Sequence, residues 1–228
     1  MEKKIYQFLV KYHGNWDDIR DAINKREQVK TDYSFRTNSN IMFIIDENYH
    51  DKFKQILLPP FFTFYKGDIQ FLSEQVIGIE GKISSNELAK IVDKKSNKVL
   101  CFNNNDFTVE NYNLLISKNI KFIVVCEGGI DSFKYEHNEN ILLISEYDNI
   151  DDYQPSNEQT VERLLHAISN EIVTGYFEIE SWKKLTYNLK NDPKKIIVSK
   201  PQYDWLSQKD SKFESYSKHI KITPASIN

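Results

Sequence analysis

Three polar or glycine-containing segments each follow an apolar run, and they are the places where this chain could do chemistry. They read "GIEGKIS" from residue 78, "FNNND" from residue 102 and "CEGGID" from residue 126. In an open parallel sheet, ligands bind outside the carboxyl ends of the strands, which is where such segments lie. Lys82 stands just past a strand and could contact an anion there, or it is a solvated loop lysine. The candidate loop residues are Gly81, Asn103, Asn104, Gly128 and Gly129.

The first of these segments lacks the pattern of a phosphate-binding loop. Glu80 stands where an anionic phosphate would approach the helix amino terminus, and no G-x-G-x-x-G follows. The asparagines at 103 and 104 suit either a tight turn or a hydrogen-bonding loop that faces a ligand. Gly128 and Gly129 allow close backbone approach or a sharp exit from the sheet. A dinucleotide site is therefore disfavoured, and we expect no cofactor.

Nucleophile and metal signatures are also missing from the sequence. Cys101 and Cys126 have no histidine or asparagine partner at a recognisable offset, so we expect buried, unreactive thiols. The five histidines are scattered, without the spacing that a metal site requires. Neither a serine elbow nor a P-loop is present. The sequence predicts a protein that is not an enzyme and holds no metal.

Apolar runs typical of buried strands alternate with helical patterns of 10 to 14 residues through most of the chain. Strands are expected at 41–45, 61–65, 75–81, 98–102, 120–126, 140–145, 171–179 and 195–199, and helices at 47–57, 84–94, 108–119, 156–169 and 181–192. This alternation predicts an α/β fold of the Rossmann-like, doubly wound type, with a mostly parallel sheet and a small N-terminal helical unit.

The chain divides into three predicted parts. Residues 1–38 form the helical unit, in which Asn15 is a plausible cap for a helix that begins at Trp16. Residues 39–202 form the Rossmann-type domain. Residues 203–228 form a C-terminal tail that packs on the domain or on a partner.

The stretch "LLPPFFTFYKGD", residues 57–68, predicts a rigid aromatic strand. Pro60 has no amide donor and pushes Pro59 into an extended conformation, so the segment from Phe61 to Tyr65 is expected to be a strand. Gly67 then turns the chain. We expect this strand to be buried at the edge of the sheet.

Composition and charge limit the partners. The chain has 228 residues, 40% of them hydrophobic, and no apolar run approaches the roughly 20 residues of a membrane span. We therefore expect a cytoplasmic protein without membrane contact. Residues 126–180 carry 13 acids against two basic residues, whereas residues 181–228 carry ten lysines against four acids. The basic tail either folds onto the acidic segment or meets a polyanion.

Residues 49–82, "YHDKFKQILLPPFFTFYKGDIQFLSEQVIGIEGK", resemble the entry to the Rossmann-like domain of the DprA/Smf DNA-processing family. The family pattern runs from a short helix through Pro-Pro, an aromatic strand and a Lys-Gly turn to a strand that ends in Gly-Thr-Arg. "GGID" at 128–131 and "ILLISEY" at 141–147 resemble later family landmarks, and the similarity spans about residues 45–202.

This resemblance implies a protein that binds single-stranded DNA, has no established catalytic activity, loads a recombinase and tends to dimerise. The candidate DNA contacts are Lys66, Lys82, Lys134 and Arg163. Lysine replaces the arginine of Gly-Thr-Arg at position 82, and Arg163 alone survives from the family's Phe-Pro-x-Arg-Asn-Arg. These losses leave two hypotheses: weak DNA binding, or a degenerate scaffold that dimerises or binds a protein partner without DNA.

Overall fold

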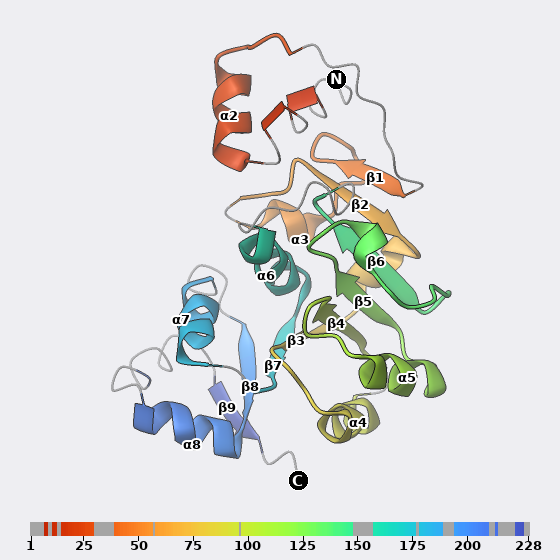
Figure 1. Cartoon of the computed structure of the whole chain (residues 1–228), viewed down its shortest axis with the longest axis vertical. Coiled ribbons are helices and arrows are strands. Elements are labelled where there is room, and N and C mark those ends of the chain that lie inside the picture. Colours follow the sequence, from red (N-terminus) through yellow and green to blue (C-terminus); the bar gives the residue numbers. More distant parts are fainter. Residues whose placement is uncertain are drawn as a thin grey trace.

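A nine-stranded sheet runs along the long axis of the molecule (Figure 1). The computed structural model describes residues 7–8, 11–12, 15–29, 39–56, 58–95, 97–147, 157–176, 178–188, 194–209, 213 and 222–225. The strands are β1 (Asn40–Phe43), β2 (Phe62–Lys66), β3 (Val76–Glu80), β4 (Val99–Asn103), β5 (Phe122–Val125), β6 (Ile141–Ser145), β7 (Glu171–Thr174), β8 (Lys195–Ser199) and β9 (Ile222–Ala225).

The order of the strands shows that the sheet is doubly wound. It reads β1-β2-β6-β5-β4-β3-β7-β8-β9. All pairs from β6 to β9 are parallel, while β2 is antiparallel to both β1 and β6. From β3 the chain first builds outward to β6 and then returns to place β7 on the other side of β3. This confirms the predicted Rossmann-like, mostly parallel architecture and puts the topological switch point between β3 and β7.

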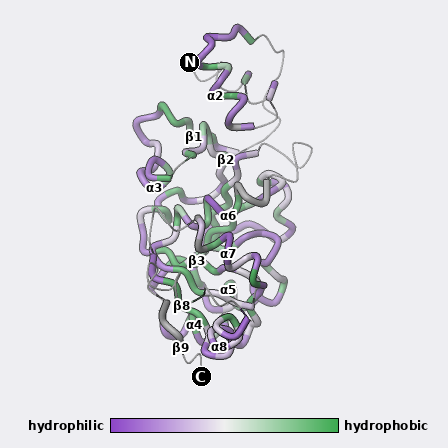
Figure 2. Tube along the Cα trace, turned by 90° about the vertical axis from the view of Figure 1, so that its left-hand side faces the viewer, coloured by the Kyte–Doolittle hydropathy of each residue, from purple (hydrophilic) through white to green (hydrophobic). Residues whose placement is uncertain are grey.

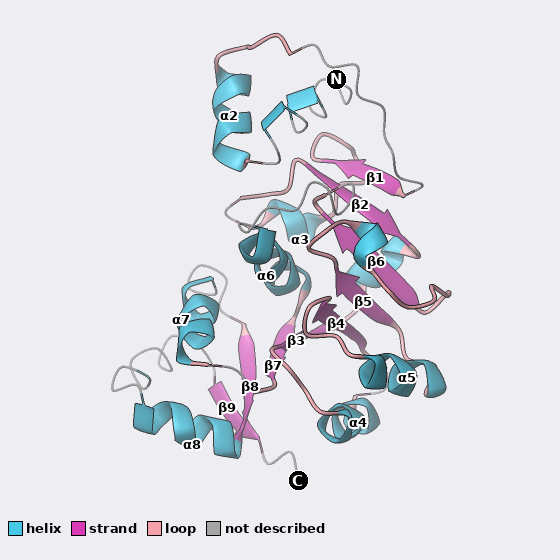
Figure 3. Ribbon diagram, in the orientation of Figure 1, coloured by secondary structure: helices cyan, strands magenta, loops and turns pink. Residues whose placement is uncertain are grey.

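Helices cover both faces of the sheet (Figure 3). They are α2 (Trp16–Asn24), α3 (Asp51–Lys54), α4 (Ser85–Lys94), α5 (Val109–Ser117), α6 (Asn157–Ile168), α7 (Ile179–Asn188) and α8 (Lys200–Lys209), with 3-10 turns η1 (Ile69–Ser73) and η2 (Ile130–Ser132). Helices α2, α4 and α5 share one core cluster, α3 and α6 share a second, and α7 and α8 share a third with β7 and β8.

The central strands are apolar because both of their faces are covered. All four residues of β5 are buried, and alternate members belong to the two opposite clusters: Phe122 and Val124 to one, Ile123 and Val125 to the other. Hydrophobic residues accordingly follow the strands in the interior, while hydrophilic segments lie on the outside (Figure 2).

Side-chain caps fix where the helices begin. Asn15 accepts a hydrogen bond from the Asp18 N–H at 3.1 Å, which confirms the predicted cap of α2. Ser84 and Thr108 form capping boxes with Glu87 and Asn111 at the starts of α4 and α5. The capped ends of α4 and α5 follow the carboxyl ends of β3 and β4 after short loops.

The aromatic strand β2 lies inside the sheet, so the prediction of an edge strand is wrong. It is flanked by β1 and β6, and β1 forms the edge. Phe62 and Phe64 are both buried, with ring centroids 5.5 Å apart. The Tyr49 hydroxyl donates to the Pro60 carbonyl at 2.6 Å, which holds the entrance of the strand. The pairing of β1 with β2, which the sequence alone did not reveal, places β2 inside the sheet.

The C-terminal segment adds to the sheet. Helix α8 runs across the boundary predicted at residues 202 and 203, and β9 pairs with β8 in parallel register. Within α8, Leu206 is fully buried with Trp182 of α7. At the other end of the chain, Ile19 of α2 packs into the cluster that also holds the β2 aromatics.

Candidate nucleic-acid interface

The carboxyl ends of β3 and β7 meet at the switch point of the sheet. Glu80 and Thr174 are the last paired residues of the two strands. The loop after β3 leads into α4 and the loop after β7 leads into α7, and these two helices cover opposite faces. In doubly wound sheets this divergence opens the crevice in which ligands bind. We therefore take the surface around residues 80–82 and 174–176 as the candidate site.

Backbone contacts join the two loops directly beyond the strands. The Gly175 N–H donates to the Glu80 carbonyl at 2.8 Å, and the Tyr176 N–H donates to the Lys82 carbonyl at 2.9 Å. Lys82 and Tyr176 also form an isolated antiparallel bridge. A Cβ atom at position 175 would lie 2.1 Å from the Lys82 carbonyl oxygen, so only glycine fits. The two loops are thus joined through their backbones at the point where β3 and β7 end.

Glu80 does not project into the candidate site. Its carboxylate lies 3.1 Å from Nε2 of His166, which is buried on α6. The pair sits on the face of the sheet that α6 covers, where the side chain of Glu80 is only 12% exposed. The acid that the sequence places in the path of an anion is therefore turned away from the loop surface.

Arg163 lies on the same helix, α6, and forms an ion pair with Glu146. Its guanidinium donates to Glu146, which directly follows β6, and both side chains are largely buried. Burial raises the pKa of the Glu146 carboxyl, and the nearby Arg163 charge opposes this shift. Arg163 therefore neutralises an internal acid at the carboxyl edge, and this contact competes with the DNA contact expected from the sequence.

The three candidate lysines are exposed, but they do not share one surface. No acidic side chain in the described part of the chain forms an ion pair with Lys66, Lys82 or Lys134. Lys82 lies at the switch point. Lys66 is the last residue of β2 and pairs with Leu143 of β6. Because β2 runs antiparallel to β6, the carboxyl end of β2 points toward the amino ends of the parallel strands. Lys134 lies in the segment that returns from η2 to the start of β6.

The asparagine loop after β4 folds on itself. The Asn103 side chain accepts from the Asn105 N–H at 2.9 Å, and the Asn104 N–H donates to the Val125 carbonyl at 3.0 Å. The Asn105 amide donates to Glu127, which is buried beside the start of the next loop. Gly128 and Gly129 are also buried and lead into η2. Both loops lie at the carboxyl ends of the parallel strands. The hydrogen bonds of the three asparagines, within their loop and to the next strand and loop, show that these residues form a turn.

Two aromatic residues at this edge were missed by the sequence patterns. Tyr176 is 66% exposed, and its ring centroid lies 6.5 Å from that of Trp205 on α8. The sequence placed Tyr176 inside a strand predicted over 171–179, whereas β7 ends at Thr174. Gly175, between a strand and an aromatic residue, is the signal that could have marked the end of the strand.

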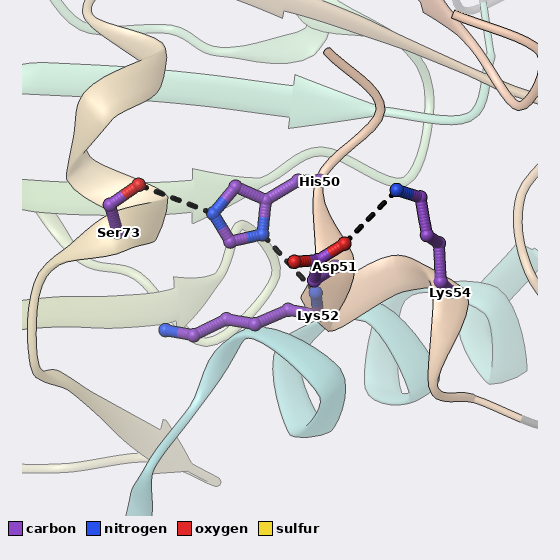
Figure 4. A network of polar contacts seen from close by, with 5 residues as sticks. All are labelled: His50, Asp51, Lys52, Lys54 and Ser73. Carbon is purple, nitrogen blue, oxygen red and sulfur yellow. Dashed lines mark hydrogen bonds and ion pairs between the residues drawn. The ribbon is translucent and has the colours of Figure 1, made fainter. Parts of the chain in front are cut away.

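A histidine network at the opposite edge has an architectural explanation (Figure 4). Nδ1 of His50 accepts from the Lys52 N–H at 3.2 Å and caps α3. Nε2 of the neutral ring must then carry the proton, so it donates to the Ser73 hydroxyl at 3.4 Å. Burial lowers the pKa of His50, which favours this neutral form. In this tautomer the ring cannot accept the proton of Ser73, as a serine nucleophile would require.

Thiol and metal chemistry find no support among the described residues. Cys101 and Cys126 are both buried, and burial raises the pKa of Cys126 to about 12, so its thiolate is disfavoured. Within the same part of the chain, no group of three histidine, cysteine, aspartate or glutamate side chains could hold a metal ion. The described helices also include none that is long and apolar enough to cross a membrane.

Comparison with known proteins relates this fold to DNA-processing proteins. No family model matches the sequence, and no curated protein does. The structure of DNA processing protein A (DprA) from Streptococcus pneumoniae matches with a TM-score of 0.64 and 16% identity, over 92% of this chain and 77% of that chain. DprA from Helicobacter pylori, described for its single-stranded DNA binding mode, matches with a TM-score of 0.55 and 17% identity, over 73% and 82%. The chain thus has the fold of DNA processing protein A.

Proposed function

We propose that this protein binds single-stranded DNA without catalysing a reaction, and that it does so at the switch point around Lys82. The proposal is supported by the shared fold with DprA, together with the position of the candidate site at the carboxyl edge of the sheet. A fold hosts many functions, so the residues of the site must themselves favour DNA binding.

The observation that carries the proposal is the separation of Lys82 from Glu80. The carboxylate of Glu80 contacts His166 on the face of the sheet that α6 covers, whereas Lys82 is exposed. Phosphate contacts depend on the sign of the local charge. The site therefore presents a cation to solvent although its sequence contains an adjacent acid.

Arg163 favours the second candidate function, a scaffold that binds a protein partner or dimerises without DNA. Its ion pair with Glu146 occupies the one arginine that survives from the family motif. A DNA phosphate would have to compete with a largely buried carboxylate for this guanidinium. The scaffold hypothesis predicts a stable dimer whose mass and stability do not respond to oligonucleotides.

Fluorescence anisotropy with labelled oligo-dT tests the proposal. We expect binding at low salt, with an affinity that falls as salt rises because counterions are released from the strand. Lys82→Gln should weaken binding and make the slope of log K against log salt shallower by about 0.7, the value for one lost phosphate contact on a single strand. Lys66→Gln is the matched control, because Lys66 likewise forms no ion pair with a described acidic residue, but its strand points toward the amino ends of the parallel strands. Absence of binding at micromolar protein and low salt would exclude the proposal.

Recombinase loading and homodimerisation are finer parts of the proposal. We infer them from the family resemblance alone. Light scattering of the free protein tests the dimer, and recombinase filament assembly on protein-coated single strands, with and without this protein, tests loading. A cytoplasmic location likewise stays a prediction.

A further inference from the structure

We propose that Tyr176, supported by Trp205, is a stacking platform for a base of the strand whose phosphate contacts Lys82. This inference rests on the proposed function and adds the residues that hold a base. It follows from the exposure of Tyr176, from the backbone that fixes it and from the cation beside it.

The exposure of Tyr176 is unusual because its backbone is held firmly. The ring is 66% exposed, while its own N–H is bonded to the Lys82 carbonyl and the preceding glycine fits tightly against the same oxygen. An aromatic residue on a fixed backbone loses little further conformational entropy when it binds a ligand. The stacking platform is therefore preorganised in the protein without DNA.

Lys82 and Tyr176 stand side by side. They are partners in an antiparallel bridge, and directly opposed residues of such a pair carry their side chains on the same face, with Cβ atoms roughly 5 Å apart. An ammonium group next to a flat ring matches the alternation of charged phosphate and flat base along a single strand. Proteins that bind single strands combine these two kinds of contact.

The ring of Trp205 lies next to that of Tyr176, with the ring centroids 6.5 Å apart. Its ring is tilted by 46° relative to Tyr176, so the two do not stack face to face. Its neighbour Leu206 is fully buried and anchors that part of α8 in the core. Trp205 is thus fixed close to the platform, where its fluorescence would report a base that stacks nearby.

The size and surroundings of the aromatic pair favour a base over a protein. Specific protein interfaces cover about 800 Å² on each partner, far more than two rings provide. Tyr176 also lies opposite the exposed Lys82 in the bridge, and the exposed Glu178 follows it by two residues in the sequence. Stacking is available to any base and needs no extended apolar surface.

The test compares three variants of the full chain in oligo-dT binding at low salt. Tyr176→Leu removes the ring, Tyr176→Phe keeps it, and Tyr187→Leu is the matched control. Tyr187 is 76% exposed but lies near the end of α7, which leads away from the carboxyl edge. We expect Tyr176→Leu to weaken binding about 5- to 150-fold, the range for loss of one stacked base. Tyr176→Phe and Tyr187→Leu should bind within about twofold of the unmodified protein, since each retains the ring at position 176.

A second readout separates stacking from phosphate contact. Oligo-dT should quench the fluorescence of the unmodified protein, and Trp205→Phe should abolish that quenching; an abasic oligonucleotide of equal charge should bind more weakly and quench less. If the unmodified protein binds oligo-dT but Tyr176→Leu binds equally well, the platform is wrong while the proposed function stands. If the unmodified protein does not bind at all, the proposed function fails and the platform falls with it.

Discussion

At the scale of residues, two acids at the carboxyl edge are each bound by a side chain of α6. His166 holds Glu80 and Arg163 holds Glu146, so one helix keeps two acids away from the loop surface. The His166 ring and the Arg163 guanidinium therefore contact these acids and not a ligand. The same contacts should therefore matter for stability, and this can be measured without any DNA.

Replacing Arg163 by methionine should destabilise the fold at neutral pH. The change leaves the Glu146 carboxylate buried without its partner, and breaking a buried ion pair costs about 3–5 kcal/mol. The folded-state pKa of Glu146 is already raised by burial and should rise further. A raised carboxyl pKa gives stability that is present below the unfolded pKa and is lost as pH rises through the folded pKa. The loss should thus be small near pH 4 and large at pH 7, as measured by urea unfolding.

The double variant Arg163→Met with Glu146→Gln is the control for this interpretation. It removes both charges, so it should recover most of the stability that the single variant loses at pH 7. Equal losses in the single variant at pH 4 and pH 7 would show that the buried carboxylate is not the cause.

Lys52 should be an unusually reactive amine. Its Nζ donates to the Asn170 side chain at 3.3 Å and to the Glu74 carbonyl at 3.4 Å. Burial lowers the pKa of this lysine to about 8, and the charge of Lys194 adds to the shift. Near pH 8 about half of the Lys52 amines should be neutral, whereas an ordinary lysine, with a pKa of about 10.4, is almost fully protonated.

Competitive labelling with a trace amine reagent, followed by peptide mass spectrometry across pH 6 to 10, measures this difference. The labelling rate of Lys52 should reach half of its maximum near pH 8, and Lys52 in the urea-unfolded protein serves as the reference. Coinciding profiles of Lys52 in the folded and unfolded protein would contradict the shift.

At the scale of elements, much of the sheet could be predicted from its apolar runs. The strand expected at 195–199 coincides with β8, and the buried runs that became β3 to β6 differ from prediction only at their ends. Strand β7 is shorter than expected: it ends at Thr174, and the N–H groups of Gly175 and Tyr176 donate to the carbonyls of Glu80 and Lys82. Residues that became α8 and β9 carry weak periodicity, and their positions depend on packing against β8.

The candidate site was only partly visible in the sequence. Lys82 could be placed at a strand end because the run before it is strongly apolar, and the structure puts it at the switch point. The loop after β7 could not be predicted as part of the site, because the neighbour of β3 depends on strand order, which local patterns do not encode. For the same reason the sequence placed Lys66 with Lys82, while the reversed direction of β2 separates them.

Gly175→Ala tests how firmly the two loops are joined. The added Cβ would lie 2.1 Å from the Lys82 carbonyl oxygen, so the loops must move apart and the bond from Tyr176 to that oxygen must weaken. Overpacking of this kind typically costs about 1–3 kcal/mol. We expect a loss of that size in urea unfolding and faster amide exchange at Tyr176. Unchanged exchange at Tyr176 would mean that the loops do not depend on this glycine.

At the scale of the whole molecule, the core consists of separate clusters. The strands β3 to β6 contribute to two large clusters, and Val173 of β7 joins one of them. Ile172 of β7 joins β8, α7 and α8 in a smaller cluster around Trp182. Proteins open locally in cooperative units whose stability follows their buried contacts. The C-terminal unit should therefore open more easily than the centre of the sheet.

Native-state hydrogen exchange should resolve these units. Amides of β4 and β5 should exchange only through global unfolding, whereas those of β8 and α8 should exchange faster, through local opening. Mild urea should accelerate exchange in the first group more strongly, because global unfolding exposes more surface. Equal rates and equal urea dependence in all four elements would show a single cooperative unit.

The reversed direction of β2 limits the path that a bound strand of DNA can take. Lys82 lies beyond the carboxyl end of β3, whereas Lys66 pairs with Leu143 in the middle of β6, and its strand points toward the amino ends of the parallel strands. A five-residue strand spans roughly 15 Å at about 3.3 Å per residue. A strand of DNA that touches both lysines must run across a helix-covered face or pass around the end of the sheet. Short oligonucleotides bound at the switch point should therefore crosslink at Lys82 and not at Lys66, and only longer ones can reach both.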